Sequence, residues 1–174
     1  MVTAPALSVE MEPGRFVRWL RGRPAWQVVI LGMLADVAGR FLIVGLLVGL
    51  FGVKPDRGEG APTPAEVLED PWMLALVVIG APLLETLVSQ VIMQKGLGRL
   101  RVFRHRPGLL ILLTGITFAS LHSYSPFYMA LVLPAGLIFA GLFHALGAGW
   151  RAFWIVALVH AAGNGWVTVM GLLH

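Results

Sequence analysis

Five long apolar segments, separated by short polar stretches, dominate the pattern of this chain. They cover about residues 26–53, 72–94, 108–126, 127–147 and 151–173. Each reaches or approaches the roughly 20 residues that an α-helix needs to cross a bilayer. The third and fourth are separated only by a turn-forming cluster of serine, tyrosine and proline. Backbone in lipid must satisfy its own hydrogen bonds, so the pattern predicts helices packed as a transmembrane bundle.

The composition supports an all-α, polytopic fold of about five spans. Of the 174 residues, 57% are hydrophobic and 13% are charged, and the mean hydropathy is +0.82. A soluble domain of this size could not bury so much apolar surface. We expect a tail with a basic interfacial helix over residues 1–25 and one membrane-embedded domain over 26–174. The sequence has no cysteine, which excludes disulfides, thiol nucleophiles and Fe–S clusters.

Charge is distributed unevenly between the two sides of the predicted spans. Most of the thirteen lysines and arginines lie before residue 26, between residues 95 and 106, or at Arg151, whereas the loop 54–71 is rich in aspartate and glutamate. The positive-inside rule places the N-terminus in the cytoplasm and, with five spans, the C-terminus outside. Arginines beside membrane spans suit anionic lipid headgroups. The lipid bilayer is therefore an expected partner, and nucleic acid is not.

Three polar clusters interrupt the apolar segments. They are Glu85 in the second, Phe118 with His122 in the third, and His160 with Asn164 in the fifth. At 1.5 Å per residue, the four polar side chains lie roughly 14–21 Å from the cytoplasmic ends of their predicted spans, near the middle of the hydrocarbon layer. Ionisable groups at that depth are costly and mark functional sites by default.

The spacing within each cluster favours chemistry over isolated interhelical hydrogen bonds. His160 and Asn164 are four residues apart, as are Phe118 and His122, so each pair shares a helix face. A carboxyl beside imidazoles can act as a general base on water. An imidazole and a carboxamide can donate hydrogen bonds to a developing oxyanion.

Other polar residues of the spans have simpler explanations. Asp36 and Arg40 are also four residues apart, and we predict that they form an ion pair within their own helix. On the second span, Ser89 shares a face with Glu85, and Gln90 adds a neighbouring polar position. We expect Thr86, Ser89, Gln90 and Phe118 to support the site.

These motifs resemble those of the CAAX protease and bacteriocin-processing family (CPBP or Abi), which includes the Rce1-like prenyl-protein endopeptidases. The family shows Glu-Glu-x-x-x-Arg, then Phe-x-x-x-His, then His-x-x-x-Asn, and the resemblance covers about residues 72–173. Here Thr86 stands in place of the second glutamate and Gln90 in place of the arginine. A hydroxyl and a carboxamide could replace that charge pair with hydrogen bonds. The motifs of this chain are Glu85-Thr86-x-x-x-Gln90, Phe118-x-x-x-His122 and His160-x-x-x-Asn164.

The resemblance implies a glutamic-type intramembrane protease without a cofactor in a bacterial cytoplasmic membrane. Glu85 and His122 would activate water, His160 and Asn164 would stabilise the oxyanion, and the substrate would be a membrane-anchored protein. Removal of a C-terminal sorting tail is the activity that we favour.

Two alternatives remain open. The first is a zinc-dependent protease with Glu85, His122 and His160 as the metal ligands, although these residues lack the His-Glu-x-x-His arrangement. The second is a non-catalytic membrane scaffold or bacteriocin-immunity protein that binds a partner through its polar cavity.

Overall fold

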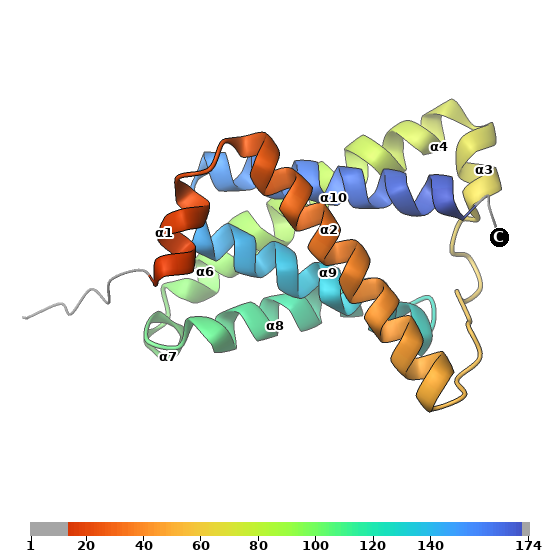
Figure 1. Cartoon of the computed structure of the whole chain (residues 1–174), viewed down its shortest axis with the longest axis horizontal. Coiled ribbons are helices and arrows are strands. Elements are labelled where there is room, and N and C mark those ends of the chain that lie inside the picture. The colour runs from red at the N-terminus through yellow and green to blue at the C-terminus, as the bar shows by residue number, and fades with distance from the viewer. Residues whose placement is uncertain (1–13, 172–174) are drawn as a thin grey trace, which may run out of the picture.

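The computed structural model describes residues 14–171, and all regular structure within them is helical, as predicted (Figure 1). The expected loose N-terminal tail and the last three residues lie outside the described residues. Helix α9 (Pro126–Ala145) packs against α8 (Pro107–Ser120), α2 (Ala25–Val44) and α10 (Trp150–Met170). These are the principal helices, and α2 has a π-helical continuation, η1 (Gly45–Leu50).

The second predicted span is a composite helix in which α-helical and π-helical turns alternate. It runs continuously from Pro71 to Gly98. Proline at position 82 contributes to the irregularity, because it has no N–H and its ring clashes with the carbonyl group four residues earlier. The composite comprises α4 (Pro71–Ala75), η2 (Leu76–Gly80), α5 (Ala81–Thr86), η3 (Leu87–Gln94) and α6 (Lys95–Gly98).

Four of the described helices are long and apolar enough to cross a membrane: Ala25–Leu50, Pro71–Gly98, Pro126–Ala145 and Trp150–Met170. The third predicted segment forms only the 14-residue helix α8, about 21 Å long at 1.5 Å per residue. It ends at Ser120 rather than near 126. The chain then turns so that α9 can begin at Pro126, with the Ser125 hydroxyl accepting the N–H of Tyr128 at 3.0 Å.

The buried core lies between α9 and α10, with single residues added from α2 and α8, and it is rich in phenylalanine and valine. Phe118, Phe139, Val156 and Val159 are all at most 1% exposed. Large apolar side chains also cover the outside of the bundle, and Trp72, for example, is 85% exposed. Apolar side chains that face outward around long apolar helices are expected of a protein whose solvent is lipid.

The two ends of the bundle differ in charge. At one end lie α1 (Arg15–Arg21), α6 and α7 (Arg101–Arg104) (Figure 1). There the Arg21 side chain donates to the carbonyl of Ala145 at 2.7 Å, near the negative end of α9. The basic interfacial helix expected before the first span corresponds to α1.

The opposite end is covered by the loop that follows η1 and by the short helix α3 (Pro64–Glu69) (Figure 1). Thr63 and Glu66 form a reciprocal capping box at the start of α3. Hydrogen bonds from Thr63 lower the pKa of the Glu66 carboxyl. The Ser125 hydroxyl donates to the carbonyl of Asp56, which fastens the loop to the turn between α8 and α9.

Candidate active site

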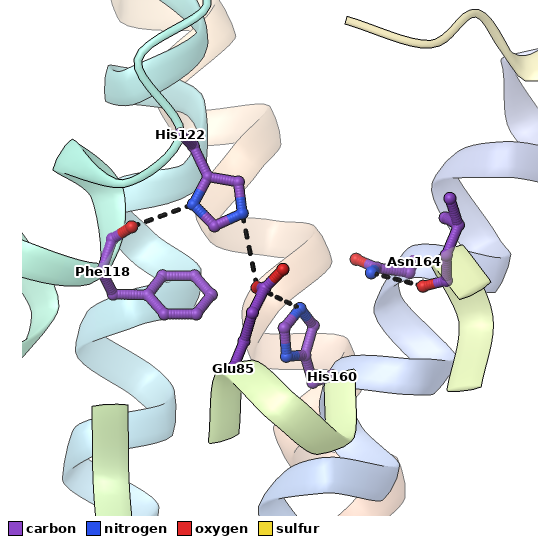
Figure 2. Close-up of polar contacts among 6 residues, drawn as sticks. Glu85, Phe118, His122, His160 and Asn164 are labelled. Carbon is purple, nitrogen blue, oxygen red and sulfur yellow. Dashed lines mark hydrogen bonds and ion pairs between the residues drawn. The ribbon is translucent and has the colours of Figure 1, made fainter. Parts of the chain in front are cut away.

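His122 and His160 converge on one oxygen of Glu85 (Figure 2). Glu85 Oε2 lies 3.4 Å from His122 Nε2 and 3.7 Å from His160 Nε2. This oxygen is buried, although about a third of the Glu85 side chain, 32%, is exposed. Three segments that are distant in the sequence therefore place a carboxyl between two imidazoles.

The protonation of His122 follows from its other ring nitrogen. Nδ1 lies 2.9 Å from the carbonyl oxygen of Phe118, and a carbonyl can only accept a hydrogen bond, so Nδ1 carries a proton. Nε2 of the neutral ring therefore presents a lone pair toward the carboxylate of Glu85. Two such acceptors are stable side by side when they share a proton, and the 3.4 Å separation of Glu85 Oε2 and His122 Nε2 places them to do so.

His122 does not lie on a regular helix with Phe118, in contrast to the sequence prediction. Helix α8 ends at Ser120, and the N–H of His122 donates to the carbonyl of Ala119 in a tight turn. The two rings still meet, with centroids 4.9 Å apart. The turn thus aims the imidazole at Glu85.

His160 is held by aromatic packing. It is 3% exposed, and its ring centroid lies 4.7 Å from that of Phe139 and 5.5 Å from that of Phe118. Its Nδ1 atom is buried without a hydrogen-bond partner among the described residues. Phe118, predicted to support the site, touches both imidazoles and is 1% exposed.

Asn164 lies apart from the three converging side chains (Figure 2). Its Nδ2 atom donates to the carbonyl oxygen of Val77 at 2.9 Å. Val77 belongs to η2, and in a π-helical register its carbonyl would face the nitrogen of residue 82. Because residue 82 is proline and has no N–H, the carboxamide of Asn164 satisfies this carbonyl instead. One N–H of Asn164 is therefore committed to the second span.

A cavity of about 130 Å³ joins these elements. Glu85 is not among the residues that line it, but both of its imidazole neighbours are. The wall is completed by the loop and α3 at the less basic end of the bundle. The polar or aromatic side chains lining the cavity are Phe118, His122, His160, Asn164, Arg40, Arg57, Tyr128 and Thr168.

Residues 67–166, more than half of the chain, match the family described as type II CAAX prenyl endopeptidase Rce1-like. The chain belongs to the Rce1-like family. No curated protein and no solved structure matches it. Family membership makes the Rce1-like chain an integral membrane protein and a protease of the CAAX type, and it implies a membrane-protein substrate. The matched region includes Glu85, His122, His160 and Asn164.

Thr86 and Gln90, the two altered positions of the glutamate motif in this Rce1-like chain, do not form a hydrogen bond with each other. Thr86 is 1% exposed and Gln90 is fully buried, yet the Thr86 hydroxyl and both polar atoms of the Gln90 side chain lack hydrogen-bond partners among residues 14–171. The wider register of η3, which begins at Leu87, removes the four-residue stacking of an α-helix between them. Ser89, also predicted to support the site, is buried on η3.

Helix α2 also contributes to the site of the Rce1-like chain, which the sequence motifs did not indicate. The predicted ion pair is confirmed, with Arg40 Nε 2.9 Å from Asp36 Oδ1. Arg40 also lines the cavity, as do Tyr128 and Thr168. An ionisable pair within an apolar span is itself a signal of function, and it was available in the sequence.

The zinc alternative concerns the placement of the possible ligands. Within the described residues, no three histidine, aspartate or glutamate side chains are gathered as a set that could hold a metal ion. Of the three suggested ligands, His122 and His160 each lie near Glu85 Oε2, at 3.4 Å and 3.7 Å from their Nε2 atoms.

Proposed function

We propose that this Rce1-like protein is a glutamic-type intramembrane endopeptidase in which Glu85 and His122 activate water. The observation that carries the proposal is the convergence of His122 Nε2 and His160 Nε2 on Glu85 Oε2 beside a polar cavity. A carboxyl and an imidazole that share a proton can remove a proton from water and later return it.

In the proposed reaction, the Glu85–His122 unit accepts one proton from water as the oxygen attacks the carbonyl carbon of the peptide bond. The C–N bond then breaks, and the same unit returns the proton to the leaving amine. His160 and the second N–H of Asn164 would donate to the oxyanion between these steps. Asn164 thus has two roles, because its first N–H is bonded to Val77.

The substrate class that we favour is a membrane-anchored protein cut beside its transmembrane anchor, as in removal of a C-terminal sorting tail. Supporting this, the cavity is lined by Arg57, Pro62 and Pro64 from the end of the bundle opposite the basic helices α1 and α7. By the positive-inside rule, that end faces away from the cytoplasm. A substrate would therefore be cut after its main domain has crossed the membrane.

Glu85→Gln tests the mechanism, because the change keeps the size and polarity of the side chain but removes the base. Membrane proteins from cells that produce the wild type or the variant would be compared by mass spectrometry of their C-terminal peptides. We expect new C-termini with the wild type and with Glu69→Gln, a control at an exposed carboxyl on α3. Glu85→Gln should produce none while reaching the same level in the membrane.

Two results would contradict the proposal. Normal cleavage by Glu85→Gln would remove Glu85 from the reaction. A wild type that forms a stable complex with an intact membrane protein, and cuts nothing, would favour the non-catalytic scaffold.

A further inference from the structure

A buried ion pair on α2 reaches the cavity from outside the matched family region. Asp36 is fully buried, and Arg40 has 14% of its side chain exposed. Asp36 also lies against α10, where a methyl group added to Gly163 would come within 2.6 Å of Asp36 Oδ2. Gly163 lies between His160 and Asn164 in the sequence. Asp36 therefore packs closely against α10, the helix that carries His160 and Asn164.

The geometry of Arg40 leaves one edge of its guanidinium group for a ligand. Nε donates to Asp36 Oδ1 at 2.9 Å, which fixes the plane of the group. Neither terminal nitrogen forms a hydrogen bond within residues 14–171, and the side chain lines the cavity with His122 and His160. Two parallel N–H groups on a planar fork match the two oxygens of a carboxylate, whereas an oxyanion offers a single oxygen.

The charges around the cavity favour an anionic ligand. Arg40 and the exposed Arg57 are the cations in its wall, and no aspartate or glutamate of the described chain lines it. Asp36 balances one of these two positive charges from behind. One carboxylate would balance the other. A buried guanidinium is stabilised most when each of its donors has an acceptor.

We propose that Arg40, oriented by Asp36, binds a carboxylate of the substrate and that Arg57 attracts this group to the mouth of the cavity. The inference rests on the proposed function, since it assigns a specificity residue to the same site. The carboxylate belongs either to the end of a peptide chain or to an acidic side chain beside the scissile bond.

Binding of three matched peptides to the full-length Glu85→Gln protein in detergent micelles would test the proposal. Each peptide is N-dodecanoyl-Ala-Val-X-Val-Ala with a fluorescent label near the acyl chain. The three arms are X = Gln with a free C-terminus, X = Glu with a C-terminal amide, and X = Gln with a C-terminal amide. Fluorescence anisotropy gives each Kd. We expect at least one charged peptide to bind about 10-fold or more tightly than the neutral peptide, and the preferred peptide identifies the source of the carboxylate.

Arg40→Gln should abolish this preference by weakening the binding of the charged peptide far more than that of the neutral peptide, and Arg40→Lys should restore only part of it. Because Arg40→Gln leaves Asp36 without its partner, the double variant Asp36→Asn with Arg40→Gln removes both charges and preserves the test. Arg101→Gln, an exposed arginine at the other end of the bundle, is the control and should keep the full preference.

Three outcomes would overturn the proposal: equal affinity of all three peptides for the Glu85→Gln protein, a preference that survives the double variant, or an equal loss of charged and neutral binding in that variant. The assay requires no cleavage. Failure of the catalytic mechanism would appear in the cleavage assay, either as cleavage by Glu85→Gln or as a wild type that cuts nothing, so the two failures are distinguishable.

Discussion

Asn164→Ala separates the structural and catalytic roles that we assign to Asn164. The change removes the donor of the 2.9 Å hydrogen bond to the Val77 carbonyl, which cannot pair with Pro82 in the π-helical register of η2. Side-chain hydrogen bonds between membrane helices contribute about 0.6–1.7 kcal/mol, and an acceptor left unsatisfied costs about 1–3 kcal/mol. We expect Asn164→Ala to lower the free energy of unfolding by about 1–2 kcal/mol.

Pro82→Ala supplies the missing N–H at position 82 and should compensate for this loss. We expect the double variant, Pro82→Ala with Asn164→Ala, to recover most of the stability but none of the cleavage, because the proposed oxyanion donor is still absent. Unfolding in mixed micelles measures the first quantity, and the C-terminal peptide assay measures the second. Additive destabilisation in the double variant would refute the link between Asn164 and the proline. Recovery of full cleavage would refute the oxyanion role.

Two further predictions test the metal and the altered motif. Treating the purified protein with a strong zinc chelator should leave cleavage unchanged. Turnover and the metal content are measured together. Stoichiometric zinc with chelator-sensitive turnover would instead establish the metalloprotease. Gln90→Met should leave the free energy of unfolding unchanged or raise it by up to about 1–3 kcal/mol. The reason is that the buried Gln90 amide has no hydrogen-bond partner among the described residues. A clear loss of stability on thermal unfolding would show that the amide is paired.

Much of this architecture could be predicted from local pattern. In lipid, a long apolar segment satisfies its backbone hydrogen bonds within itself by forming an α-helix. The positions and the order of the long helices therefore follow from hydropathy. The polar residues inside those runs were also informative. Glu85, His122 and His160 must find partners within the protein because lipid offers none, and the structure brings these three together.

The register of the second span required the tertiary structure. Hydropathy does not distinguish an α-helical turn from a π-helical turn. The π-helical segments η2 and η3 on either side of Glu85 could therefore not be predicted from the hydropathy pattern. The expected pairing of Thr86 with Gln90 assumed an α-helical register and was wrong for that reason. The early end of α8 likewise moved His122 from a helix face to a turn.

Contacts between distant segments were also decided only by the fold. The bond from Asn164 to Val77 spans 87 residues of sequence, and its cause is a proline whose effect depends on the local helical register. In the sequence, an ion pair with Asp36, one turn away on the same helix, was enough to explain the charge of Arg40. Only the packing of α2 against α10 places that arginine in the wall of the cavity, since a local pattern specifies which face of a helix is polar but not which helix it will meet.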